Sequence, residues 1–315
     1  MLMSPSNLER ILVIKLGALG DFIQAMGPAQ AIRRHHPDAQ ITLLTTAPFE
    51  KLARAAPYFD AVWIDTRPSI RRNPGALLRF RKRLRAAAFT RVYDLQTSDR
   101  SSFYRMLFLP GPMPEWSGIA RGASHLHANP RRDFIHTIER QRDQLKYAGI
   151  DDVPMTDLSW LDGDLSGLTL AASGLVLLVP GGAAHRPEKR WPAAAYAALA
   201  VQLAARGLQP VILGGTIEQA LAQEICASVP QAIDLSGKTD FGMIAALARR
   251  ARCAVGNDTG PMHLIAATGC PATVLFSSAS DPEITRPRGP EVTVLRRERL
   301  ADLSPAEVAA SLPLG

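Results

Sequence analysis

The sequence predicts an α/β protein built from two Rossmann-like domains, each with a parallel β-sheet. Three observations predict this class: the expected strands are short apolar runs, they do not alternate with polar residues, and each is followed by a segment with helical spacing. Such strands are typical of parallel sheets covered by helices on both faces. The pattern occurs twice along 315 residues, and its roughly thirteen elements fit two open domains better than one barrel.

The first half of the chain contains four expected strands, at residues 11–16, 41–44, 61–64 and 92–95. A helix is expected after the first strand because Phe22, Met26 and Ala29 recur at helical spacing. Pro48 suits the first turn of a short helix after the second strand. A basic helix is expected between the third and fourth strands, and a helix over residues 136–148 closes this half.

The second half repeats the alternation of strand and helix. Strands are expected at residues 175–179, 211–213, 233–235, 253–255 and 273–276. Helices are expected after Pro192 as far as Gly207, which can end that helix, and then from Glu218, over residues 241–250, and after residue 260.

The pattern is interrupted between residues 151 and 172 by aspartate, proline and glycine. We therefore expect one domain over residues 1–165 and a second over residues 166–315. Ligands of open parallel sheets bind beyond the carboxyl ends of the strands. If the carboxyl ends of the two sheets face each other, the ligands of both domains meet in one central cleft.

The composition excludes several other classes of protein. Three cysteines without CxxC spacing argue against a disulfide framework or a zinc site, so a reducing cytoplasm is the expected location. The first ten residues lack the basic and apolar regions of a signal peptide. The uncharged stretch 165–184 is densely apolar only over residues 175–179, so it predicts a buried strand between loops and not a membrane span.

The formal charge of +7 comes largely from one segment. Eight basic residues and no acidic residue lie between Arg67 and Arg85, and the helix expected there has an apolar face of Leu77, Phe80 and Leu84. One interpretation is a solvated surface helix; the other is a binding face for an anionic partner, either a phosphorylated acceptor or an acidic membrane leaflet. Nucleic acid is a weaker candidate because no nucleic-acid-binding module accompanies the segment.

The first candidate motif follows the first strand and runs from Lys15 to Asp21. Gly17 and Gly20 allow a sharp turn and a close approach of a ligand to the backbone. Asp21 lies at the expected start of a helix, where it could cap the helix or act as a general base toward a sugar hydroxyl. The motif is not GxGxxG, so it does not indicate a dinucleotide site.

The second motif follows the strand at 175–179. Gly181 and Gly182 come first, and Lys189 and Arg190 come just before a helix. Two cations beside the backbone N–H groups of a helix start are typical of a diphosphate site. The alternative is an ordinary exposed Lys-Arg pair, and His185 is interpreted as a loop residue.

The third motif, Gly256-Asn-Asp-Thr-Gly-Pro-Met-His263, follows the strand at 253–255. Asp258 and Thr259 could cap a helix or bind hydroxyls, and N–H groups near Gly260 could hold phosphate oxygens. His263 lies one turn into the helix, where a histidine is either a packing residue or a phosphate ligand. A cap alone does not require both polar residues, two glycines and the histidine.

These motifs, LGALGD, PEKRWP and GNDTGPMHL, resemble in sequence and order those of glycosyltransferase family 9, the heptosyltransferase family of lipopolysaccharide inner-core assembly. The resemblance covers nearly the whole chain. It implies a GT-B fold of two Rossmann-like domains facing a central cleft, with the acceptor bound mainly by the first domain and the nucleotide sugar by the second. It also implies inversion at the anomeric carbon without an essential metal or cofactor, with ADP-heptose as the sugar donor.

The resemblance assigns roles to individual residues. Asp21 would be the general base, Lys189 would stabilise the leaving diphosphate, and Asp258 would hold sugar hydroxyls. Acceptor contacts are expected from Lys15, Gly17, Gly20 and Gln96, and from Arg79 and Arg83 of the expected basic helix. Donor and phosphate contacts are expected from Gly181, Gly182, Arg190, Glu218 (toward the ribose), Thr259, Gly260 and His263.

The chain departs from the family pattern at two places. Residues 277–282 read SSASDP where members often carry a GPTDP-like segment, and Thr97 stands where many members have glycine. We expect these positions to face the donor and the acceptor. Asp281 is the candidate to replace contacts of the altered segment.

Four other functions compete with heptose transfer. A family member could use a different nucleotide sugar, and an epimerase with the same architecture would release nucleotide without an acceptor. A binding protein without catalysis is a further candidate, and a dehydrogenase is disfavoured because no GxGxxG follows a strand. The expected partners are a nucleotide sugar and a phosphorylated lipid-linked glycan, with peripheral contact to the inner face of the cytoplasmic membrane. The protein is expected to be a monomer that does not bind nucleic acid.

Overall fold

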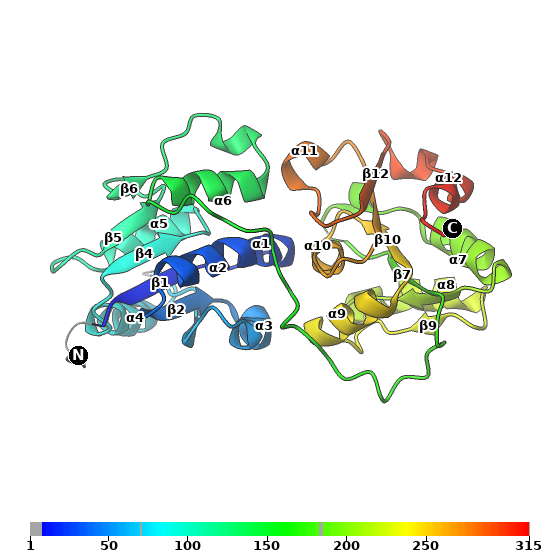
Figure 1. The fold of residues 1–315 in the computed structure, drawn as a ribbon, viewed down its shortest axis with the longest axis horizontal. Coiled ribbons are helices and arrows are strands. Elements are labelled where there is room, and N and C mark those ends of the chain that lie inside the picture. Colours follow the sequence, from blue (N-terminus) through cyan, green and yellow to red (C-terminus); the bar gives the residue numbers. More distant parts are fainter. Residues whose placement is uncertain (1–7, 70, 183–184, 315) are drawn as a thin grey trace. The chain divides into compact units, whose positions relative to one another are not determined.

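The computed structural model describes residues 8–69, 71–182 and 185–314. The chain divides into two compact units, residues 1–156 and 157–315, and each is described here by itself (Figure 1). The domain boundary expected at residue 165 lies inside the second unit. Within the described residues, no helix is both long enough and apolar enough to cross a membrane.

The first unit contains a six-stranded parallel sheet with the strand order β3-β2-β1-β4-β5-β6. Its strands are β1 (Arg10–Ile14), β2 (Gln40–Thr45), β3 (Ala61–Ile64), β4 (Arg91–Asp94), β5 (Glu115–Gly118) and β6 (His125–Leu126). The four strands expected from the sequence are confirmed as β1 to β4. Strands β5 and β6 were not expected, because neither contains a run of apolar residues.

The helices of this unit are α1 (Leu19–Gln24), α2 (Met26–His35), α3 (Glu50–Ala55), α4 (Pro74–Ala86), α5 (Asp99–Met106) and α6 (Thr137–Lys146). Helix α4 is the expected basic helix, and the side chain of Asn73 caps it by accepting a hydrogen bond from Ala76 N. Its Leu77 and Leu84 are buried as predicted, and Phe80 packs edge-on against Tyr104 of α5.

The second unit contains another six-stranded parallel sheet, with the order β12-β11-β10-β7-β8-β9. Its strands are β7 (Leu175–Val179), β8 (Gln209–Ile212), β9 (Ile233–Asp234), β10 (Cys253–Asn257), β11 (Ala272–Phe276) and β12 (Val292–Arg296). Its helices are α7 (Ala193–Ala205), α8 (Gln219–Ala227), α9 (Phe241–Arg250), α10 (Gly260–Ala267), α11 (Pro282–Thr285) and α12 (Pro305–Ala310). The half-exposed edge strand β12 was not expected from the sequence.

Each sheet is covered on both faces. Leu12 and Ile14 of β1 pack against α4 and α5 in one apolar cluster, whereas Ile11 and Val13, which point to the other face, are equally buried. This burial on both sides explains why the central strands are continuous apolar runs. The predicted class, α/β with two parallel-sheet units, is therefore confirmed.

The strand orders locate the position where ligands of such sheets bind. The direction of the connections reverses between β1 and β4 in the first sheet and between β7 and β10 in the second. Ligands of open parallel sheets bind beyond the carboxyl ends of the strands at this reversal. The first two motifs follow β1 and β7, and the third begins with the last two residues of β10, so all three lie at these positions.

Candidate functional site

A small pocket of about 50 Å³ lies at the carboxyl ends of β1 and β4 in the first unit. It brings together three residues that the sequence predicted as site residues, Lys15, Asp21 and Gln96. Helix α6 contributes Arg140, Gln141 and Gln144, none of which the sequence indicated. These residues are more than a hundred positions from the first motif, so only the folded sheet shows that they share a pocket.

Two cations lie near the Asp21 carboxylate. The Lys15 side chain is buried, and its Nζ donates a hydrogen bond to Leu95 O at 3.2 Å. Burial lowers the pKa of Lys15, and the negative charge of Asp21 opposes this shift. Burial likewise lowers the pKa of Arg140, again with Asp21 as an opposing charge. The site therefore pairs one carboxylate with two partly desolvated cations.

Asp21 does not cap its helix. It is the third residue of α1, whose N-cap is Ala18, and no described side chain caps that helix start. Within the described residues, no hydrogen bond to the Asp21 carboxylate is observed, although the residue lines the pocket. Of the two roles that the sequence left open, the capping role therefore has no structural support.

The loop that precedes Asp21 requires glycine at its first turn. Gly17 has a φ of +125°, and a Cβ there would lie 2.7 Å from the ring of Phe49. Gly20 is buried in the first turn of α1. The Gln96 side chain accepts a hydrogen bond from Leu16 N at 2.8 Å, so it joins the loops that follow β4 and β1.

Thr97 occupies a strained backbone position beside this pocket. Its φ is +46°, in the left-handed region that favours glycine. The buried Asp94 supports the turn, because its Oδ1 accepts hydrogen bonds from the backbone N of Gln96 at 3.1 Å and of Thr97 at 3.0 Å. Burial raises the pKa of Asp94 to about 6. The chain thus has threonine, where many family members have glycine, at a position whose backbone conformation favours glycine.

The predicted contacts Arg79 and Arg83 lie on α4, and no residue of α4 is among the described residues that line the Lys15–Asp21 pocket. The guanidinium of Arg83 stacks on the ring of Trp63 at 3.8 Å from the ring centroid. Burial against this surface lowers the pKa of Arg83. The structure therefore does not bring Arg79 and Arg83 together with Asp21 in one pocket.

A larger pocket of about 450 Å³ lies at the carboxyl ends of β7 and β10 in the second unit. Seven of the predicted donor-site residues line it: Gly181, Gly182, Lys189, Glu218, Asp258, Thr259 and Gly260. His185, which the sequence analysis interpreted as a loop residue, also lines this pocket, together with Arg186. The second and third motifs therefore form a single site, although 69 positions separate Lys189 from Asp258.

An ion pair crosses this pocket between the two motifs. Lys189 Nζ lies 2.7 Å from Asp258 Oδ2, and Ser280 Oγ donates to the same oxygen at 2.8 Å. The side chains of Lys189 and Asp258 are only 14% and 8% exposed. Ser280 belongs to the segment that departs from the family pattern, whereas the neighbouring Asp281 caps α11 by accepting a hydrogen bond from Glu283 N. Ser280, not Asp281, therefore contacts the site.

Thr259 carries a buried hydroxyl that has no hydrogen-bond partner among the described residues. It is the N-cap residue of α10, yet its side chain does not cap the helix, and its Oγ1 is buried without a hydrogen bond to any described residue. Gly260 and Pro261 form the first turn of α10, where backbone N–H groups are not used inside the helix. Hydrogen-bond donors thus gather at one wall of the pocket beside Lys189, an arrangement suited to an anion.

Glu218 explains two of the glycines. Its carboxylate is largely buried and accepts a hydrogen bond from Gly215 N at 2.8 Å. A Cβ at Gly181 would lie 3.0 Å from the Glu218 side chain, and a Cβ at Gly214 would lie 2.8 Å from it. Glycine at both positions therefore gives this carboxylate the space to line the pocket.

Two predicted donor residues are absent from the described lining of the pocket. Arg190 donates from Nη2 to Gly182 O and therefore holds the glycine loop. His263 is buried within α10. Arg190 therefore supports a wall of the site, whereas His263 lies on the helix whose first residues form another wall.

Asn257 joins the segments of this site, a role that the sequence did not indicate. Its side chain is fully buried, donates to Pro180 O and Gly181 O, and accepts from Trp191 N at 3.0 Å. It therefore connects the glycine loop, the segment that carries Lys189, and the end of β10. Its position inside the third motif was the available signal, but the motif was interpreted through its charged and glycine residues.

Within the described part of the chain, no group of three or more His, Cys, Asp or Glu side chains is placed to hold a metal ion.

Comparison with known proteins agrees with this architecture. The profile of Glycosyltransferase family 9 (heptosyltransferase) matches residues 77–307. Lipooligosaccharide heptosyltransferase 2 of Haemophilus influenzae is 32% identical over 120 residues, which cover 36% of this chain and 34% of that protein. The matched region is thus about a third of the length of that relative.

Two solved structures share the fold over nearly the whole chain. The glycosyl transferase family 9 structure from Veillonella parvula has a TM-score of 0.83 at 21% identity and covers 96% of this chain and 95% of its own. The ADP-heptose lipopolysaccharide heptosyltransferase II of E. coli has a TM-score of 0.78 at 21% identity, with 96% of each chain covered. On the match of the family profile to most of its length, the chain belongs to glycosyltransferase family 9, the heptosyltransferase family.

Proposed function

We propose that this protein transfers a heptose from ADP-heptose to an inner-core acceptor of lipopolysaccharide, with inversion at the anomeric carbon and without a metal ion. The observation that carries the proposal is one wall of the 450 Å³ pocket. It contains Lys189, the N–H groups at the start of α10, and the Thr259 hydroxyl, which has no partner among the described residues. Membership of the heptosyltransferase family and the similar fold of the E. coli ADP-heptose enzyme support the choice of donor.

The diphosphate of the donor would bind at this wall. A phosphate oxygen at the start of α10 accepts hydrogen bonds from backbone N–H groups and from Thr259 Oγ1, which has no competing partner among the described residues. Lys189 supplies a positive charge at the same wall. Without a ligand, Asp258 neutralises that charge at 2.7 Å. When the diphosphate takes over Lys189, the Asp258 carboxylate becomes available to accept hydrogen bonds from sugar hydroxyls.

The acceptor would bind beside Asp21. The Asp21 carboxylate accepts no hydrogen bond from the described residues and lines the pocket, so it is available to take a proton, as a general base must be. Lys15 and Arg140 would attract an acidic group of the acceptor and keep it close to Asp21.

The reaction is then a single displacement. Asp21 accepts the proton of the acceptor hydroxyl while the hydroxyl oxygen forms a bond to the anomeric carbon. The bond from that carbon to the diphosphate oxygen breaks, and ADP leaves with the electron pair from the opposite face. Negative charge grows on the departing diphosphate, so Lys189 and the start of α10 stabilise the transition state more than the bound substrate.

A thermal-shift panel with ADP, UDP, GDP, CDP, dTDP and NAD tests the donor. A ligand present at 100 times its dissociation constant stabilises a protein by about 2.7 kcal/mol, which raises the melting temperature by several degrees. We expect stabilisation by ADP and a weaker effect of the other nucleotides. Preference for another diphosphate would contradict the proposed donor, and no response to any diphosphate would contradict the phosphate site. In a separate incubation with ADP-heptose, release of ADP without an acceptor would indicate an epimerase.

A further inference from the structure

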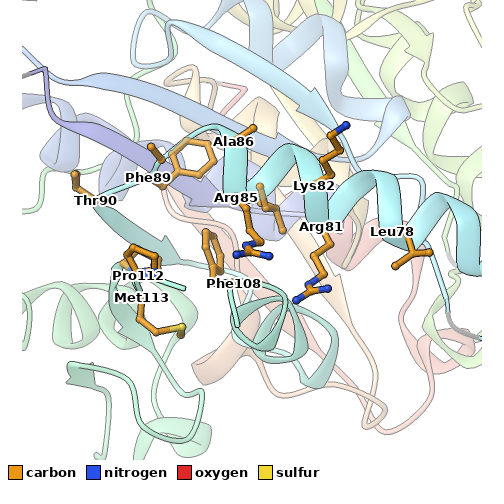
Figure 2. Close-up of a pocket in the computed structure, with 13 residues that line it drawn as sticks. Leu78, Arg81, Lys82, Arg85, Ala86, Phe89, Thr90, Phe108, Pro112 and Met113 are labelled. Carbon is orange, nitrogen blue, oxygen red and sulfur yellow. The ribbon is translucent and has the colours of Figure 1, made fainter. Parts of the chain in front are cut away.

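A second cavity of the first unit, about 820 Å³ in volume, is not explained by sugar transfer. It lies between α4 and the segment that leads from α5 to β5, and Figure 2 shows the side chains that line it. Its volume is in the range of about 300–1,000 Å³ that small-molecule sites occupy. We call this cavity, which is defined by its lining residues, the α4 cavity.

The α4 cavity lies at the opposite end of the strands from Asp21. Phe89 and Thr90 come just before β4, and residues 112–114 come just before β5, so these lining residues lie at the amino ends of the strands. Lys15 and Gln96 follow β1 and β4 and therefore lie at the carboxyl ends. Four residues of β4 separate the two ends, which is about 13 Å at the rise of a β-strand. The cavity is thus separate from the pocket that contains Asp21.

The described lining of the α4 cavity combines apolar side chains with positive charges. Phe89, Phe108, Met113 and Leu84 form the apolar part of this lining. Arg81, Lys82 and Arg85 also line the cavity, and no acidic residue is among its described lining. A ligand that complements this surface has an apolar body and a negative group.

The two arginines differ in how they are held. Arg81 is tied to the end of α5, because its guanidinium donates to Leu107 O and Leu109 O. Arg85 makes no hydrogen bond or ion pair with any described side chain, and its guanidinium lies over Gly111, where a Cβ would be 3.3 Å from Nη2. Both guanidinium groups extend from α4 toward the side on which Phe108 and Met113 lie (Figure 2). Among the described residues, Arg85 is therefore an unpaired cation that lines this cavity.

Exposed apolar side chains lie on both segments that Arg81 joins. Leu78, one turn before Arg81 on α4, is 62% exposed, and Leu109 is 41% exposed. Exposed apolar residues beside cations are typical of surfaces that contact an anionic membrane. The surroundings of the cavity therefore suit contact with an anionic membrane. Its interior suits a ligand with an apolar body and a negative group.

We propose that the α4 cavity binds one anionic phospholipid of the membrane, with the phosphate on Arg85 and Arg81 and an acyl chain against Phe89, Phe108 and Met113. The bound lipid anchors the first unit at the amino ends of its strands. The pocket at their carboxyl ends, which contains Asp21, stays free. This site uses cations other than Arg79 and Arg83, the two that the sequence suggested for the acceptor. It does not depend on the sugar that the protein transfers.

The direct test is a titration of the full-length protein with dihexanoyl phosphatidylglycerol, kept below its micelle concentration and followed by calorimetry. We expect binding of this lipid, at least tenfold weaker binding of dihexanoyl phosphatidylcholine, and no binding of glycerol 3-phosphate at the same concentration. Arg85→Gln should weaken binding about tenfold or more, because it removes a charge-assisted hydrogen bond. Arg79→Gln is the matched control, since Arg79 is exposed on the same helix but does not line the cavity, and it should change affinity less than twofold.

A second variant tests the cavity without changing charge. Ala86 lines the cavity at an exposed helix position, so Ala86→Trp should fill it while the protein still folds. We expect this variant to lose binding of the soluble lipid and to co-sediment less with vesicles containing 30% phosphatidylglycerol. Equal losses in Arg85→Gln and Arg79→Gln, unchanged binding in a folded Ala86→Trp, or equally tight binding of glycerol 3-phosphate would each overturn the proposal. No sugar donor is present in these assays, so their failure leaves the proposed transfer activity unaffected.

Discussion

Lys189 Nζ lies 2.7 Å from Asp258 Oδ2 in the lining of the donor pocket, and the two residues come from different sequence motifs. The pair is largely shielded from solvent, so neither charge is left unpaired before a ligand arrives. Ser280 shares the same carboxylate oxygen at 2.8 Å. This contact places the altered 277–282 segment at the donor site.

Lys189→Met should weaken ADP binding by about 10- to 100-fold, because it removes a charge-assisted contact worth roughly 1.5–3 kcal/mol. Calorimetric titration with ADP measures the effect. Arg206→Gln, at an exposed position after α7 and outside the pocket lining, removes the same charge and should leave affinity unchanged. An unchanged ADP affinity in Lys189→Met would mean that Lys189 serves only to pair with Asp258.

Asn257→Ala should destabilise the second unit by about 3 kcal/mol or more. The substitution leaves Pro180 O and Gly181 O without their buried donor and Trp191 N without its acceptor. Urea unfolding followed by fluorescence measures the loss. Gln223→Ala, on an exposed position of α8, should cost less than about 0.5 kcal/mol. Equal stability of the two variants would show that the network around Asn257 contributes nothing.

Asp94 should make the stability of the first unit depend on pH. Its pKa is raised by burial from 3.8 to about 6, so the folded state binds a proton more tightly than the unfolded state. The resulting stability is fully present below pH 3.8 and is lost as the pH rises through 6. Asp94→Asn keeps the oxygen that accepts from Gln96 N and Thr97 N but cannot ionise.

We therefore expect Asp94→Asn to gain stability relative to the wild type between pH 4 and pH 7, by about 2–3 kcal/mol. Unfolding by urea at pH 4, 5, 6 and 7 gives the comparison. A difference between the two proteins that stays constant over this range would be inconsistent with a raised pKa of Asp94.

Thr97→Gly should stabilise the first unit by up to about 1 kcal/mol. The φ of +46° is strained for threonine but not for glycine, and the gain is reduced by the greater freedom of glycine in the unfolded chain. Ala88, with a φ of +49°, allows an independent comparison through Ala88→Gly. A loss of stability in Thr97→Gly would indicate that the threonine side chain makes a contact that outweighs the strain.

The sequence predicted the central strands and the order of the motifs because these depend on local patterns. Strand β7 is five consecutive apolar residues, and such a run has few alternatives to a buried strand. Strand β5 was missed because Trp116 is its only large apolar residue. The two-residue strand β6 is too short to produce any pattern.

The sequence predicted the site residues that its motifs emphasise. It missed the residues whose roles depend on contacts that only the folded chain forms. Arg140 and Gln144 reach the Asp21 pocket from α6, a helix whose sequence shows only an ordinary polar face. Asn257 was overlooked because its role is set by three backbone segments that only the folded unit brings together. The role of Ser280, likewise, follows from its contact with Asp258 and not from its own motif.

The most direct test of Asp21 as the general base compares heptose transfer by the wild type and by Asp21→Asn, with ADP-heptose as donor and a lipopolysaccharide inner-core acceptor. Loss of a general base typically lowers the rate about 10²–10⁴-fold, so we predict a loss of that size in the turnover number with unchanged ADP affinity. Asp38→Asn, at an exposed position outside the pocket lining, should retain the wild-type rate. A correctly folded Asp21→Asn protein that transfers heptose at nearly the wild-type rate would contradict the assignment of Asp21 as the base.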